Sequence, residues 1–190
     1  MNKQKGFTLL EMIVALGIFS IVAVLTAGTI VSFNRVQKKT INIQNAHDNI
    51  RYALETMARA IRTGDAYCKQ DAGLTCSGGS SVCAWSTGGC DTFAFRESIS
   101  GSNYVYRRGV VAGKGIIERS TDGVNFTIIT DPRIDITKLR FYVSGITDSP
   151  YALSSTEQQK VTIVVEIRSG TGTQISQLNM QTTVTKRKLF

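Results

Sequence analysis

An uninterrupted apolar segment lies near the N-terminus of the chain. Met12–Phe33 contains no charged side chain and no proline, and consists mainly of Ile, Val, Leu, Ala and Phe. Its 22 residues are enough to span a bilayer, since a helix rising about 1.5 Å per residue needs roughly 20. A helix also satisfies its own backbone hydrogen bonds, which lipid cannot do. The pattern predicts a membrane-spanning helix.

An amphipathic pattern continues from Asn34 to Thr63 without Pro or Gly. Charged residues lie on one side, and the i,i+4 spacing of Arg51, Glu55 and Arg59 stabilises a helix by a few tenths of a kcal/mol per pair. A surface helix or a coiled coil has similar periodicity, but the continuity with the apolar segment favours one long helix packed on a sheet. The apolar side, with a seven-residue repeat, consists of Val36, Ile43, Ala46, Ile50, Ala53, Leu54, Met57, Ala60 and Ile61.

His47, the only histidine, falls on the apolar side of this predicted helix. No catalytic triad or metal cluster can be assembled around it from the sequence. We therefore interpret His47 as a packed or edge residue.

Gly, Ser and Thr dominate residues 64–91, which we interpret as a loop without regular elements. Four cysteines lie in it, and in an exported segment they predict two disulfides with three possible connectivities. Zinc ligation is the main alternative, but separations of eight, seven and seven residues lack the close pairs of zinc sites. The four are Cys68, Cys76, Cys83 and Cys90.

Alternating apolar and polar residues from Thr92 onward predict β-strands with one face on a core. The clearest are Val161–Ile167 and Leu178–Val184, expected to pair around Gly170-Thr171-Gly172. Thr121-Asp122-Gly123-Val124 predicts a hairpin. Asp122, Asp131 and Asp135 lack the dense spacing of a calcium loop and are better suited to turns. An antiparallel sheet against a long helix makes the fold class α+β.

Glu11 lies at the start of the apolar segment, where a carboxylate is costly unless it has a partner. One interpretation leaves it solvated at the headgroup interface. The other relies on its position one turn from Phe7. If the chain is cut between Gly6 and Phe7, the new α-amino group is a cation with which Glu11 of a neighbouring subunit can pair. We favour the second interpretation. A secretory signal peptide requires neither this carboxylate nor so long an apolar run.

Gly6-Phe7-Thr8-Leu9-Leu10-Glu11, with a short basic leader before it and an apolar segment after it, resembles the class III signal of type IV pilins and type II secretion pseudopilins. The resemblance implies that a prepilin peptidase of the inner membrane cuts after Gly6 and N-methylates Phe7. It also implies that Glu11 guides docking into a filament. The order of the late strands is loosely similar to that of J-type minor pseudopilins.

The expected organisation follows from these segments: a leader (1–6), a transmembrane and filament-core helix (7–33), its amphipathic outer half (34–63), the Cys/Gly-rich loop (64–91) and a sheet region (92–190). The resemblance implies three kinds of partner: the prepilin peptidase, other pilin or pseudopilin subunits, and the inner-membrane assembly platform. Lys3 and Lys5 weakly favour a cytoplasmic N-terminus. We expect a single-pass inner-membrane precursor with its bulk outside, later part of a pilus or pseudopilus.

The formal charge of +8 falls to +6 without Lys3 and Lys5, and the remaining cations are scattered along the chain. A solvated basic surface explains this better than a nucleic-acid site, so DNA uptake is a weaker alternative. The sequence contains no phosphate loop, nucleophile elbow or paired cysteine and histidine. We expect a structural subunit without catalytic residues, metal or cofactor. The rival hypothesis is a signal-anchored binding protein that never polymerises.

Overall fold

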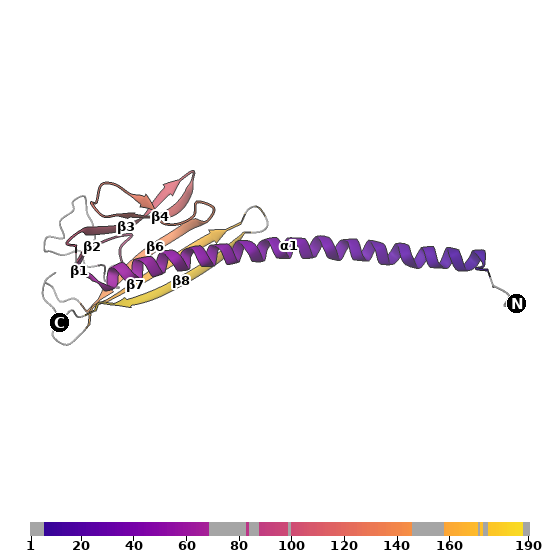
Figure 1. Cartoon of the computed structure of the whole chain (residues 1–190), viewed down its shortest axis with the longest axis horizontal. Coiled ribbons are helices and arrows are strands. Elements are labelled where there is room, and N and C mark those ends of the chain that lie inside the picture. Colours follow the sequence, from indigo (N-terminus) through magenta and orange to yellow (C-terminus); the bar gives the residue numbers. More distant parts are fainter. Residues whose placement is uncertain are drawn as a thin grey trace. The chain divides into compact units, whose positions relative to one another are not determined.

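The computed structural model describes residues 6–68, 83, 88–98, 100–145, 158–170, 172 and 175–187, apart from the side chains of Asp65, Ala66 and Cys68. The chain divides into two compact units, Met1–Ile41 and Asn42–Phe190. The first contains the N-terminal part of helix α1, and the second combines the end of that helix with the strands of two antiparallel sheets (Figure 1). The α+β class predicted from the sequence is confirmed.

Helix α1 runs without interruption from Leu9 to Arg62. Burial on a sheet begins only at Ala46, while Val36, which the heptad pattern placed on the packed side, is 62% exposed. The predicted apolar side of the helix is therefore buried in its C-terminal half, and the prediction is wrong at Val36. His47 lies at the edge of this apolar side, with 47% of its side chain exposed and Nδ1 3.7 Å from Asp48 Oδ1.

Five strands form the first antiparallel sheet, in the order β1-β2-β3-β4-β5. Their bounds are Gly64–Cys68 (β1), Thr92–Glu97 (β2), Asn103–Val111 (β3), Lys114–Ser120 (β4) and Thr127–Ile128 (β5). Strands β4 and β5 form the hairpin expected at Asp122. Asp122 holds the turn by accepting hydrogen bonds from the backbone N–H groups of Asn125 and Val124 at 2.8 and 2.9 Å, and these bonds lower the pKa of its carboxyl group.

Three strands form the second antiparallel sheet, in the order β6-β7-β8. They are Asp135–Ser144 (β6), Lys160–Ser169 (β7) and Ser176–Thr185 (β8). Strands β7 and β8 pair without a register shift from Lys160↔Thr185 to Ser169↔Ser176. The predicted pairing of the two late strands is thus confirmed.

The prediction that residues 64–91 contain no regular element is wrong at the start of this range, where β1 forms. Strand β1 pairs with β2, and Cys90 forms an isolated bridge with Phe141. The aromatic ring of Tyr67 explains β1, because Tyr67 is only 4% exposed and its ring lies 5.7 Å from that of Phe93. Burial of that ring outweighs the Gly-rich composition around it.

The sequence predicted one sheet, but the strands divide into two because β6 does not continue the ladder of the first. On the side away from β7, its backbone is held by other groups. Arg108 Nε donates to Ile136 O at 2.5 Å, while Cys90 and Phe141 exchange two backbone hydrogen bonds of 2.9 and 2.8 Å. Val143 N donates to Cys83 O at 2.6 Å. These contacts cover an edge that would otherwise be open.

Cys83 and Cys90 form a disulfide with their Cα atoms 5.1 Å apart. Both are buried, at 0% and 3% exposure, and their bonding removes them from any zinc site. Cys76 and the side chain of Cys68 lie outside the described residues. One of the two predicted disulfides is therefore seen, and it links the two residues whose backbones bond to the edge of β6.

Removing this disulfide should destabilise the second unit. For the double substitution Cys83→Ser and Cys90→Ser we expect the free energy of unfolding to fall by about 2–3 kcal/mol, because the short closed loop gains freedom in the unfolded chain. Denaturant unfolding of the oxidised protein and of the variant measures the difference. An unchanged midpoint would show that the backbone bonds to β6 hold the segment without the disulfide.

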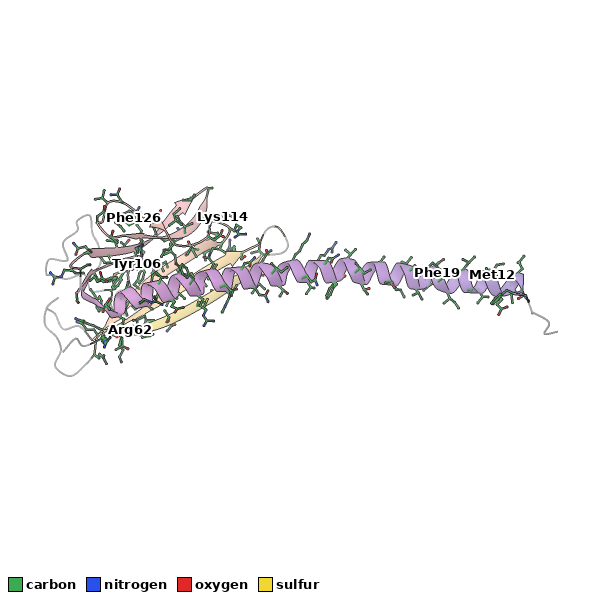
Figure 2. The ribbon with its side chains drawn as sticks, in the orientation of Figure 1. Met12, Phe19, Arg62, Tyr106, Lys114 and Phe126 are labelled. Atoms are coloured by element: carbon green, nitrogen blue, oxygen red, sulfur yellow. A yellow bond between two sulfur atoms is a disulfide. The ribbon has the colours of Figure 1, made fainter. Side chains whose placement is uncertain are left out.

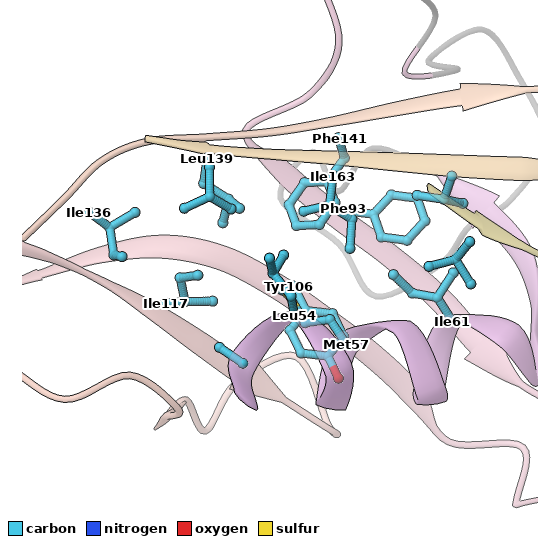
Figure 3. Close-up of a cluster of buried hydrophobic side chains, with 14 of the residues drawn as sticks. Leu54, Met57, Ile61, Phe93, Tyr106, Ile117, Ile136, Leu139, Phe141 and Ile163 are labelled. Carbon is cyan, nitrogen blue, oxygen red and sulfur yellow. The ribbon is translucent and has the colours of Figure 1, made fainter. Parts of the chain in front are cut away.

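The core lies between the C-terminal part of α1 and the two sheets (Figure 3). Met57 and Ile61 from α1 meet the rings of Phe93 and Phe141, which stack with centroids 5.1 Å apart. Further buried members include Ile50, Leu54, Phe95, Tyr106, Ile117, Ile136, Leu139 and Ile163. Strands β6 and β7 bury alternate apolar residues, as the period-two pattern predicted. In the first sheet, β2 and β4 each bury three consecutive residues, so the pattern is not followed there.

The end of α1 is fixed by partners from three segments. Its last carbonyl groups have no partner within the helix and need external donors when buried. Tyr67 Oη donates to Ile61 O at 2.8 Å, Arg187 N to Arg62 O at 3.0 Å, and Ser98 N to Thr63 O at 3.2 Å. The helix end is therefore tied to β1, to the end of β2 and to the segment after β8.

Tyr106 is fully buried, and its hydroxyl makes no hydrogen bond of ordinary geometry among the described residues, although the nearby Arg119 side chain favours the ionised form. Burial raises the pKa of Tyr106 from 10.0 to about 12. As the pH rises, the unfolded state therefore loses the tyrosine proton first, so stability is full below about pH 10 and decreases between about pH 10 and 12.

Tyr106→Phe should remove this loss of stability at alkaline pH. At neutral pH we expect unchanged stability or a gain of up to about 1 kcal/mol, because a buried hydroxyl without a well-formed hydrogen bond is costly. Thermal unfolding at neutral pH and near pH 11 tests both points. A clear loss of stability at neutral pH would show that the hydroxyl makes a favourable contact.

Candidate functional site: the N-terminal signal

The described residues before α1 lie outside the helix and are exposed. Gly6, Phe7 and Thr8 are not helical, and the Phe7 side chain is 80% exposed. The peptide bond between Gly6 and Phe7 therefore lies outside the helix, two residues before its first residue, Leu9. Such a bond is accessible to an enzyme that binds an extended strand.

Thr8 is the N-cap of α1. Its carbonyl oxygen accepts the first helical hydrogen bond, from Met12 N at 3.3 Å, and its Oγ1 accepts a second, from Glu11 N at 3.3 Å. A threonine followed three residues later by glutamate is a capping-box sequence. The side chain of Thr8 thus satisfies one of the N–H groups that a helix leaves unpaired at its start.

Glu11 lies in the first turn of α1 and is exposed. A carboxylate in this position is favoured by the partial positive charge at the helix N-terminus. The sequence analysis assigned Glu11 a docking partner and did not predict this role at the helix start. The spacing of Thr8 and Glu11 was the signal that could have shown it.

Gly6 is not required by the conformation of the chain. A Cβ atom at Gly6 would meet nothing within 4 Å, and Gly6 is absent from the residues with positive φ. Gly64 is the opposite case, because a Cβ atom there would lie 2.4 Å from a ring carbon of Phe95. Any need for glycine at Gly6 must therefore come from a molecule that binds this segment.

The N-terminal part of α1 buries none of its apolar side chains. A window of 18 residues has a mean hydropathy of 2.5 and is 0% buried, so the helix is long and apolar enough to cross a membrane. Met12 and Phe19, at 54% and 69% exposure, project from the ribbon with nothing packed over them (Figure 2). An apolar surface of this extent implies lipid or another apolar partner.

Three hydroxyl groups within this apolar part bond to the helix itself. Ser20 Oγ donates to Leu16 O at 2.8 Å, Thr26 Oγ1 to Val22 O at 2.7 Å, and Thr29 Oγ1 to Thr26 O at 2.8 Å. No partner outside the helix is needed for these three side chains. These three side chains therefore meet the requirement that lipid imposes on polar groups.

Residues 1–27 match the family described as the prokaryotic N-terminal methylation motif. The chain carries a prepilin-type signal. In general, a prepilin-type signal implies processing by a prepilin peptidase and association with other pilin subunits, and together with the apolar helix it is consistent with membrane anchoring. No curated protein and no solved structure matches the chain. The match ends at residue 27, so it does not test the similarity of the late strands to J-type pseudopilins.

Proposed function

We propose that the chain is the precursor of a structural subunit, a minor pilin or pseudopilin, of a type IV pilus-like or type II secretion filament. The observation that carries this proposal is the position of the prepilin-type signal: its Gly6–Phe7 bond is exposed and directly precedes a helix with an uncovered apolar surface. A signal for cleavage and a helix that needs a partner thus occur together, as assembly requires.

Cleavage would create the charge that Glu11 needs. Hydrolysis of the Gly6–Phe7 bond consumes one water, leaves a carboxylate on Gly6 and frees the amine of Phe7. That amine is protonated at neutral pH, and a single methyl group leaves its charge in place. A cation close to the positive end of a helix is unfavourable by itself. The carboxylate of Glu11 offsets it, within the subunit or on a neighbour.

Pairing with a neighbour explains assembly better than pairing within one chain. A carboxylate entering lipid carries a cost of about 2.5–3.5 kcal/mol. In a filament, Glu11 of one subunit can meet the Phe7 amine of the next while the exposed apolar side chains pack against each other. The same contact would then stabilise the subunit and determine its axial position.

The proposal that the chain is a minor subunit rests on the second compact unit, Asn42–Phe190. Residues 64–91 are rich in Gly, Ser, Thr and Cys in the sequence, and the described strands form two sheets in place of one. Such features suit a subunit present in few copies, in a pilus, a secretion pseudopilus or a competence filament. The rival hypothesis, a signal-anchored protein that stays in the membrane, predicts the same outer fold.

Fractionation distinguishes the two hypotheses. Cells expressing the tagged chain together with the peptidase and sibling prepilins of its own system are sheared, and the filaments are collected by sedimentation. We expect the processed chain in the filament fraction. If it is found only in membranes while sibling subunits sediment, the anchored protein is the correct description.

A further inference from the structure

The hydroxyl of Thr8 provides the basis for an inference about cleavage. We infer that Thr8 is a positioning residue for the processing reaction: by capping α1 it keeps the Gly6–Phe7 bond outside the helix, at a fixed number of residues before the helix start. This inference rests on the proposed function, because it concerns the same cleavage. It adds a residue whose action is on the helix rather than on the peptidase.

The geometry shows how the cap sets the boundary. An N-cap residue has non-helical dihedral angles while its carbonyl already accepts a helical bond. Thr8 fits this description, with Met12 N and Glu11 N donating to its carbonyl oxygen and Oγ1, both at 3.3 Å. The chain before Thr8 therefore leaves the helix at a defined residue, and Phe7 is left exposed.

Two alternatives for the helix start compete with the observed one. Without the cap, the first turn can fray toward Glu11, or the helix can extend backward through Phe7, where no proline blocks it. Both changes move the scissile bond relative to the apolar helix that the peptidase must also meet. Only the molecules with the correct boundary are competent, so the apparent efficiency falls with their fraction.

Gly6 supports this division of roles. Its surroundings are open, so the chain places no steric demand there. The peptidase would then recognise the residue before the scissile bond. Thr8, within the chain, would determine where that bond lies relative to the helix. The two requirements are independent, and substitutions separate them.

The test compares four precursors with the wild type, each full length in detergent micelles with purified prepilin peptidase. Thr8→Val keeps the shape of threonine and removes the hydroxyl, whereas Thr8→Ser and Thr8→Asn keep a capping group. Thr26→Val makes the same chemical change inside the helix, where the hydroxyl bonds only to Val22 O. Initial cleavage rates and the amide exchange of Glu11 are measured for each.

We expect Thr8→Val to be cut about fivefold more slowly, the equivalent of about 1 kcal/mol for a lost cap. Its Glu11 amide should exchange faster. Thr8→Ser, Thr8→Asn and Thr26→Val should be cut at nearly the wild-type rate. Equal rates for Thr8→Val and the wild type would overturn the inference.

Slow cleavage of Thr8→Ser and Thr8→Asn would also overturn the positioning role, because the peptidase would then be reading the shape of threonine directly. An unchanged exchange rate at Glu11 in Thr8→Val would exclude the cap as the cause. A wild-type precursor that is not cut at all contradicts the proposed function itself, and the positioning role fails with it.

Discussion

Gly6→Ala is expected to lower the rate of precursor cleavage by roughly 10- to 200-fold, the range that one methylene group is worth in a closely fitting pocket. The chain itself should not respond, because a Cβ atom at Gly6 meets nothing within 4 Å. The defect would therefore belong to the peptidase complex. Cleavage assays of the purified precursor, with thermal unfolding of the same samples, measure both effects.

Gly64→Ala is the matched control. The same methyl group at Gly64 would lie 2.4 Å from the ring of Phe95 and 3.2 Å from the carbonyl oxygen of Ile61. Overpacking of this kind costs about 1–3 kcal/mol, so the second unit should lose stability while cleavage stays normal. If Gly6→Ala is cut at the wild-type rate, the role assigned to Gly6 in cleavage is wrong.

Glu11→Gln is expected to reduce filament incorporation on the order of a hundredfold, with cleavage retained. Glutamine also serves at the third position of a capping box, so the start of α1 should be preserved. What is lost is the charge that pairs with the Phe7 amine, and an unpaired buried charge costs about 3–5 kcal/mol. Quantitative blots of sheared filaments and of membranes give the incorporated and processed fractions.

Asp48→Asn provides the control for charge alone. Asp48 is on the same helix, and 81% of its side chain is exposed. Its neutralisation should leave incorporation unchanged, since exposed charges contribute little. Normal incorporation of Glu11→Gln would contradict the docking role and leave Glu11 with its local role at the helix start.

The elements that the sequence predicted well are those with a long, regular period. The apolar and amphipathic segments together predicted one helix, and α1 spans Leu9–Arg62. The alternation in Val161–Ile167 and Leu178–Val184 predicted a hairpin, because β7 and β8 are adjacent in the chain and bury one face each. In both cases local pattern and tertiary packing agree.

The features that sequence reasoning missed depend on long-range contacts. The Gly-rich surroundings of Tyr67 concealed β1, which forms because that ring packs with Phe93. The division into two sheets depends on Cys83, Cys90 and Arg108 covering one edge of β6, and none of these contacts has a periodic signal. Val36 followed the heptad pattern, yet no described residue covers its exposed side chain.

At the candidate site, the sequence motif identified Gly6, Phe7 and Glu11, but it did not explain their spacing. Thr8 was read as part of a motif, although its hydroxyl bonds to the backbone of Glu11. A capping box is visible in sequence only when the start of the helix is known. The structure supplies that start at Leu9.

Intact-mass measurement of the wild-type protein extracted from membranes tests the central claim most directly. The account predicts a mass lacking Met1–Gly6 and increased by one methyl group, with the methyl group located on Phe7 by fragmentation. Detection of the full-length, unmodified chain in cells with an active prepilin peptidase would contradict it.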